Sequence, residues 1–98
     1  MRKENYEWQL FVLILKEVAA EKGVTQEMIA QRSGLLQSNI SRVFALKYKP
    51  TLDTFLQVAK AVGVNFYIED KEGKTDLNAC FDRANESLKS RPDMKNKN

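Results

Sequence analysis

The sequence predicts a mainly α-helical protein: a bundle of short helices containing a helix-turn-helix, followed by a short C-terminal strand and a C-terminal helix. Three observations support this fold class. Apolar residues recur at spacings of three and four in several short segments, which is the period of a helix that buries one side. Glycines follow these segments, where a helix can end. One β-branched and aromatic run, residues 64–69, is too short for a helix and typical of a strand.

The first helix is predicted from about Tyr6 to Lys22, with Gly23 as its end. Its buried stripe is expected to hold Trp8, Phe11, Val12, Leu15, Val18 and Ala19. Trp8 can also be interpreted as an exposed binding aromatic, but its spacing to the other members of the stripe favours burial.

Residues 25–50 contain two short helical patterns separated by Ser33-Gly34-Leu35. Thr25 is a suitable N-cap for the first of them, and Gly34 supplies the positive φ that the turn requires. The second pattern runs from Leu36 to Phe44, with its amides and hydroxyls on the outer faces. Two helices joined by a short turn with a glycine are typical of a helix-turn-helix.

A fourth helix is predicted after Pro50, with Thr51 as its cap and Gly63 as its end. Its apolar face is expected to hold Leu52, Phe55, Leu56, Ala59 and Val62. Together with the preceding helices it forms a predicted first domain over residues 1–63.

Residues 64–89 are predicted to form an extension that mediates dimerisation or partner binding. It begins with the strand Val64 to Glu69, which needs a pairing partner, either the segment around Thr75 to Leu77 or the same strand in a second copy. A last helix from Leu77 to about Lys89 follows, capped by Thr75 or Asp76. Its apolar stripe includes Cys80, which is expected to be a small buried residue. Residues 90–98 are predicted to be a disordered tail.

The charge is distributed unevenly, although the net charge is only +3. Acids make up 13 of the 98 residues, yet none lies between Met28 and Leu52. The same window contains Arg32, Arg42, Lys47 and Lys49. A local positive field of this kind is what phosphate binding requires.

Several classes of function have little support. The chain has no histidine and one cysteine, which argues against an internal disulfide, an ordinary zinc site and any mechanism built on an imidazole base. With no paired carboxylates or phosphate-binding glycine loop either, we predict no enzyme activity, cofactor or metal. The longest apolar run, Leu10 to Leu15, is too short to span a membrane, and we expect a cytoplasmic protein.

The second helix of the motif has the side chains that the DNA major groove can bind. We predict that Gln37, Ser38 and Arg42 read bases, with Arg42 reaching either a guanine or a phosphate. The predicted phosphate contacts are Gln26, Asn39, Ser41, Lys47, Tyr48 and Lys49. Gln26 begins the preceding helix, where free N–H groups suit an anion, and its amide is also within reach to brace Gln37.

These motifs resemble the lambda-repressor-like, or Xre-type, helix-turn-helix family of bacterial and phage regulators and antitoxins. The resemblance rests on Thr25-Gln26-Glu27-x-Ile29-Ala30, Ser33-Gly34-Leu35, Gln37-Ser38-Asn39-Ile40-Ser41-Arg42, Lys49-Pro50-Thr51-Leu52 and Ala59-Lys60-Ala61-Val62-Gly63-Val64. It implies base reading by the residues at 37, 38 and 42 and phosphate binding by those at 26 and 39. The chain departs from the family pattern at Leu36, Phe44 and Leu46, where the family usually has a capping Ser or Thr, a Glu and a Gly.

The resemblance implies a sequence-specific transcriptional regulator, acting as a repressor on double-stranded DNA. One recognition helix, about residues 37–45, reads few bases, so a homodimer on a two-fold operator is expected. The alternative is an antitoxin that also neutralises a small toxin protein. In both cases the dimer or partner surface is assigned to Phe66, Ile68, Leu77, Phe81 and Leu88. A helix-turn-helix used only for protein contact is a further alternative.

Overall fold

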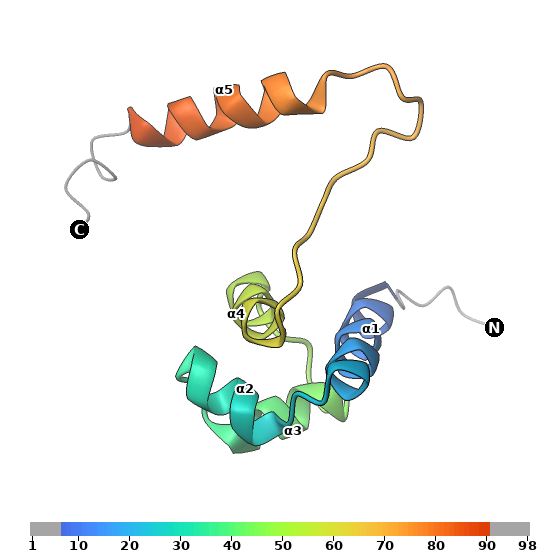
Figure 1. Cartoon of the computed structure of the whole chain (residues 1–98), viewed down its shortest axis with the longest axis vertical. Coiled ribbons are helices and arrows are strands. Elements are labelled where there is room, and N and C mark those ends of the chain that lie inside the picture. Colours follow the sequence, from blue (N-terminus) through green and yellow to red (C-terminus); the bar gives the residue numbers. More distant parts are fainter. Residues whose placement is uncertain (1–6, 91–98) are drawn as a thin grey trace. The chain divides into compact units, whose positions relative to one another are not determined.

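The computed structural model describes residues 7–90, and their regular structure consists of five helices (Figure 1). They are α1 (Glu7–Lys22), α2 (Gln26–Ser33), α3 (Gln37–Phe44), α4 (Leu52–Val62) and α5 (Leu77–Lys89). The chain divides into two compact units between Asn65 and Phe66. The first unit therefore holds α1 to α4 and the second holds α5.

Side-chain caps set the beginnings of three helices where the sequence places them. The Thr25 hydroxyl accepts a hydrogen bond from the Met28 N–H at 3.1 Å, and the Thr51 hydroxyl accepts one from the Thr54 N–H at 3.1 Å. The Asp76 carboxylate does the same for the Ala79 N–H at 3.1 Å, so Asp76 rather than Thr75 caps α5. Each cap satisfies an N–H group that has no partner within its helix. The predicted helices are confirmed, apart from the start at Tyr6, which lies outside the described residues.

The core of the described residues lies entirely in the first unit. α2 packs against α3 and α4, and α1 packs against α3 and α4. The buried apolar residues are Val12, Leu15, Ala19, Val24, Ile29, Ile40, Val43, Phe44, Val58, Ala59, Ala61 and Val62. α3 is thus anchored through three of its eight residues, which leaves its opposite side to solvent.

The predicted apolar stripes of α1 and α4 are wrong at their edges. Phe11 is 51% exposed and Leu52 is 71% exposed, and Leu56 is also exposed. Trp8 is half-buried and packs against the core, as its spacing indicates. The differences arise because two short helices crossing at an angle cover only the centre of each other's apolar side.

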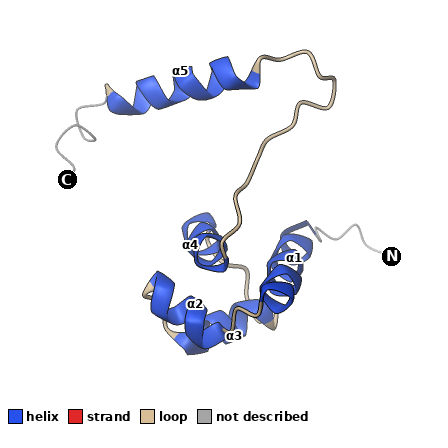
Figure 2. Ribbon diagram, viewed as in Figure 1, coloured by secondary structure: helices blue, strands red, loops and turns tan. Residues whose placement is uncertain are grey.

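The predicted strand from Val64 to Glu69 is wrong: the described residues contain no strand, and this segment runs as an irregular connection (Figure 2). The hairpin partner considered for it is not a strand either, because Leu77 is already the first residue of α5. Strand propensity reflects packing against a neighbouring strand, and no described segment forms a ladder with residues 64–69.

Asp70 organises the turn that leads into α5. Its carboxylate accepts hydrogen bonds from the N–H groups of Glu72 at 3.0 Å, Lys74 at 3.1 Å and Thr75 at 2.9 Å. A hydrogen bond from the Thr75 side chain, followed by those from the backbone, lowers the pKa of Asp70 to about 2. α5 itself has no buried residue and ends at Lys89, with Ser90 as its C-cap. The rest of the predicted disordered tail lies outside the described residues.

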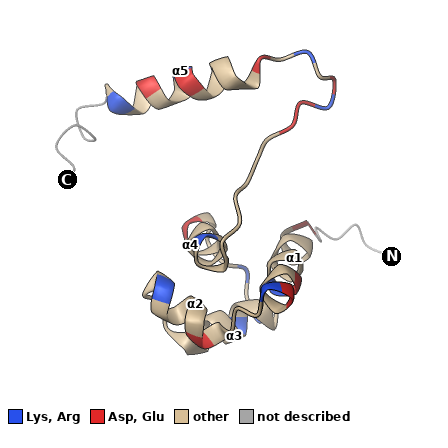
Figure 3. Ribbon diagram, viewed as in Figure 1, with Lys and Arg blue, Asp and Glu red and all other residues tan. Residues whose placement is uncertain are grey.

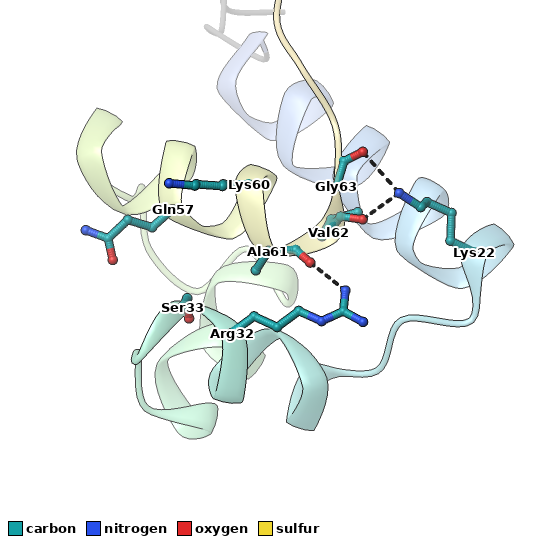
Figure 4. Close-up of a pocket in the computed structure, with 8 residues that line it drawn as sticks. All are labelled: Lys22, Arg32, Ser33, Gln57, Lys60, Ala61, Val62 and Gly63. Carbon is teal, nitrogen blue, oxygen red and sulfur yellow. Dashed lines mark hydrogen bonds between the residues drawn. The ribbon is translucent and has the colours of Figure 1, made fainter.

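Two cations join α1 and α2 to the end of α4 (Figure 4). The Lys22 ammonium donates to the carbonyl oxygens of Val62 at 2.7 Å and Gly63 at 3.0 Å. The Arg32 guanidinium donates to the carbonyl oxygen of Ala61 at 2.9 Å. Because the last carbonyls of a helix lack partners and carry partial negative charge, both contacts stabilise the C-terminus of α4.

Candidate nucleic-acid interface

The turn between α2 and α3 sets the direction in which α3 leaves α2. Gly34 has φ 81° and ψ 0°, and its N–H donates to the carbonyl oxygen of Ala30 at 2.8 Å. The Ser33 hydroxyl accepts a hydrogen bond from the Leu35 N–H at 3.1 Å. The left-handed conformation at Gly34 ends α2, and α3 begins three residues later. This is the helix-turn-helix that the sequence predicts.

The outward side of α3 presents polar side chains. Ile40, Val43 and Phe44 hold the opposite side in the core. The exposed residues of the helix are Gln37, Ser38, Ser41 and Arg42, and Asn39 is half-buried. Arg42 follows Ser38 by four residues, so the two share a face of the helix. The structure therefore brings the three predicted base-reading residues to the exposed side of one helix.

The N-terminus of α3 has no side-chain cap. Leu36 occupies the N-cap position, makes no capping hydrogen bond and is 67% exposed. Its carbonyl oxygen accepts the N–H groups of Asn39 at 3.0 Å and Ile40 at 3.2 Å. The N–H groups of the first two residues, Gln37 and Ser38, have no acceptor within the helix. Such donors at a helix N-terminus favour an anion such as a DNA phosphate.

The end of α3 is a Schellman motif with a leucine in the position that usually holds glycine. Leu46 has φ 60°, the one positive φ at a non-glycine residue in the described chain. Its N–H donates to the carbonyl oxygen of Val43 at 2.9 Å, and the Lys47 N–H donates to that of Arg42 at 2.9 Å. The Leu46 side chain packs against the core, which holds it in this conformation.

Arg42 and Tyr48 lie together. The Arg42 guanidinium carbon is 5.2 Å from the centre of the Tyr48 ring, a cation–π distance. Lys47 and Lys49 flank the tyrosine and are exposed. A predicted base-reading residue and three predicted phosphate contacts are thus neighbours at the end of α3 and in the loop that follows.

Three of the four cations in the acid-free window belong to α3 and the loop after it, and Figure 3 colours the Lys and Arg positions along the chain. Arg32 belongs to the acid-free window, but its guanidinium bonds to the end of α4. Arg42, Lys47 and Lys49 remain on α3 and its loop. Asp53, in the first turn of α4, is the acid nearest to these residues in sequence.

Gln26 is the first residue of α2 and is half-buried. No hydrogen bond joins it to Gln37 among those the structure describes, so the expected bracing is not formed. The Arg42–Tyr48 contact and the role of Arg32 were missed by sequence reasoning, since both depend on residues that lie apart in the chain. Leu46, where the family usually has a Gly, was the one sequence signal for the unusual end of α3.

The described residues contain no group of three or more His, Cys, Asp or Glu side chains arranged for a metal ion. Cys80 is half-buried on α5 and has a free thiol. Within residues 7–90, no helix has the length and apolar character needed to cross a membrane.

Comparison with known proteins supports the assignment of a helix-turn-helix. A family model described as helix-turn-helix matches residues 15–68, more than half of the chain. No curated protein and no solved structure matched the chain. The chain therefore belongs to the Xre, or lambda-repressor-like, helix-turn-helix family and is a DNA-binding regulator.

Proposed function

We propose that the protein is a sequence-specific transcriptional repressor in the cytoplasm, which binds a two-fold operator as a homodimer and inserts α3 into the major groove. The observation that carries this proposal is the outward side of α3. Its amide, hydroxyl and guanidinium groups are exposed, and the side chains of Gln37, Ser38 and Ser41 make no hydrogen bond to another described residue. Polar groups left open on one side of an anchored helix can bond to base edges.

Each group on this side of α3 has a specific role in the proposal. Gln37 pairs through both ends of its amide with adenine, and Ser38 bonds to a neighbouring base edge. Arg42 contacts a guanine from the same face, oriented by stacking on Tyr48. Because Tyr48 is half-buried, it limits the conformations of the arginine and lowers the entropy lost on binding.

Phosphate contacts position α3 in the groove. The N-termini of α2 and α3 offer N–H groups, with Gln26 at the first and Asn39 and Ser41 on the second. Lys47, Tyr48 and Lys49 contact the backbone at the other end of α3. These contacts are independent of sequence and make the affinity depend on salt.

Dimerisation is proposed to occur through the C-terminal extension. Its apolar side chains are accessible to solvent: Ile68, Phe81, Phe66 and Leu88 are exposed, and Leu77 is half-buried. α5 has no buried residue, so its apolar stripe does not pack into a core within its own unit. A dimer would place two copies of α3 about 34 Å apart, one turn of DNA.

The test is fluorescence anisotropy on the DNA upstream of the gene, with scrambled DNA of the same composition as the control. We expect tighter binding to the upstream DNA and a steep loss of affinity with salt. Equal affinity for the two DNAs would contradict sequence-specific regulation while leaving the fold assignment intact.

The exposed apolar residues of the extension also favour a second function, that of an antitoxin. In this alternative the same stripe of α5, including Phe81 and Leu88, binds a small toxin protein, and the helix-turn-helix represses the shared operon. The test is expression of the neighbouring reading frame alone and together with this protein. Growth arrest that the wild-type protein relieves and a Phe81→Ser variant does not would support it; no arrest would exclude that neighbour as a toxin.

A further inference from the structure

We infer that the first unit has its own self-association surface, formed by the outer sides of α1 and α4 and occupied by a second copy of this chain. This surface, called here the α1–α4 patch, consists of Leu10, Phe11, Ile14, Leu52 and Leu56. The inference goes beyond the proposed function, because it requires neither DNA nor the C-terminal extension. Its test is made without DNA, on a full chain in which the apolar residues of the extension are substituted.

α1 is apolar on two sides. Val12, Leu15 and Ala19 face the core, yet Leu10, Phe11 and Ile14 on the other side are exposed. A helix that is apolar all round is normally covered all round. Within the described residues of its own unit, nothing covers the outer side of α1.

The patch continues from α1 onto α4. The rings of Phe11 and Phe55 meet edge to face, with centres 6.5 Å apart. Between the two helices lies an apolar hollow of about 240 Å³, lined by Trp8, Phe11, Val12, Lys49, Pro50, Leu52 and Phe55. Leu52 is therefore at the edge of a depression that an exposed side chain from another molecule can enter.

The area of the patch is suited to a protein contact. The five side chains are between 44% and 71% exposed. If a large apolar side chain has about 150–200 Å² of surface, they leave about 400–500 Å² open. This lies within the range of about 300–600 Å² found for the largest apolar patch of a monomer, which is often functional, and it is about half of what each partner buries in a standard interface. The half-buried Trp8 and Phe55 extend it further.

The charges at the two ends of the patch favour a second copy. Lys49 lines the hollow at the N-terminal end of α1. Glu17 and Glu21 follow Ile14 by three and seven residues and so lie on its side of the helix, at the C-terminal end. In an antiparallel two-fold pair of α1 helices that forms without DNA, Lys49 of one copy meets the glutamates of the other. On DNA, Lys49 is the proposed phosphate contact instead. The patch is thus complementary to itself, as an isologous contact requires.

The test is sedimentation equilibrium of the full chain across the micromolar range, without DNA. A background variant removes all five apolar side chains assigned to the dimer surface of the extension, so any association that remains is assigned to the first unit. Its substitutions are Phe66→Ser, Ile68→Ser, Leu77→Ser, Phe81→Ser and Leu88→Ser. We expect this background to form dimers. Adding Ile14→Ser or Leu52→Ser should raise the dissociation constant about tenfold, because a two-fold contact contains each substituted residue twice.

Leu36→Ser is the matched control. Leu36 is an exposed leucine of the first unit, but it lies at the N-cap of α3 and is not part of the α1–α4 patch. It should leave the dissociation constant unchanged. Emission of the single tryptophan, Trp8, should shift to shorter wavelength as the background variant associates and should stay constant in the Ile14→Ser variant. A background variant that stays monomeric, or patch variants that associate as well as the Leu36→Ser control, would overturn the inference.

Discussion

Gln37 and Lys49 illustrate how two exposed polar residues of one motif differ in what they contribute. Gln37 begins α3 and has both a donor and an acceptor to offer to a base. Lys49 lies in the loop after α3 and offers only a positive charge. A base contact depends on sequence and a phosphate contact does not, so substitution separates the two roles.

We predict that Gln37→Ala weakens binding to the cognate DNA by about 1–3 kcal/mol and changes binding to random DNA little. Lys49→Ala should weaken both alike and reduce the salt dependence. Anisotropy titrations of both variants on both DNAs provide the measurement. Equal losses on the two DNAs for Gln37→Ala would count against a base-reading role.

Leu46 is a residue at which backbone strain and packing oppose each other. An L-residue in the left-handed region costs about 1 kcal/mol, and glycine avoids this cost. The leucine side chain offsets it by packing on the core.

We predict that Leu46→Gly is more stable than Leu46→Ala by about 1 kcal/mol, although glycine is normally the less stabilising residue. Both substitutions remove the packing contact, so their difference isolates the strain. Urea unfolding of the two variants measures it. A Leu46→Ala variant as stable as Leu46→Gly would show that the φ of 60° stores no strain.

At the scale of single elements, the helix ends decide where the motif begins and stops. α2, α4 and α5 have side-chain caps at their N-termini, but α3 has Leu36 and no cap. The missing cap costs α3 about 1 kcal/mol of stability. It also leaves the N–H groups at the start of α3 open, where a regulator would meet a phosphate. A helix that binds DNA through its N-terminus gains from this arrangement.

The turn before α5 depends on the ionisation of Asp70. Its folded pKa of about 2 lies below the model value of 3.8, so the charged carboxylate stabilises the turn. Because the pKa of this acid is lower in the folded state, its ionisation stabilises the turn fully above pH 3.8. This stabilisation is lost as the pH falls through 2.

We predict that carboxyl NMR shifts of Asp70 titrate with a pKa of about 2, as its hydrogen bonds require. Hydrogen exchange at the N–H groups of Lys74 and Thr75 should become faster as the turn loses its acceptor. An Asp70→Asn variant is the control, since its exchange should show no such pH dependence between about 2 and 4. A pKa near 3.8 would mean that the turn does not hold the carboxylate.

The whole molecule consists of a unit with a core and a unit without one. All the buried apolar residues lie between Val12 and Val62, and α5 has none. The first unit therefore holds nearly all the stability that burial provides to the described chain.

We predict that a chain ending at Asn65 keeps cooperative thermal unfolding with a melting temperature close to that of the full protein. Its affinity for the cognate DNA should fall at least tenfold if the C-terminal extension joins two DNA-binding units. Circular dichroism and anisotropy measure the two effects on the same preparation. Loss of the cooperative transition would show that residues 66–98 belong to the folding unit.

The sequence by itself determined the helices, their caps and the helix-turn-helix. Thr25, Gly34, Thr51, Asp76 and Gly63 act through hydrogen bonds and backbone conformations within a few residues, so local sequence is sufficient to predict them. The same local pattern placed Gln37, Ser38 and Arg42 on one side of α3, opposite the buried Ile40 and Val43.

Only the tertiary structure decided which apolar residues are buried and which charged residues contact other parts of the molecule. It left Phe11 and Leu52 open, directed Arg32 to the end of α4 and brought Tyr48 beneath Arg42. It also left residues 64–69 without a ladder, since a strand needs a partner that local sequence cannot supply. The periodicity of the sequence indicates which side of a helix is apolar. How much of that side is covered depends on how the helix crosses others that are distant in sequence.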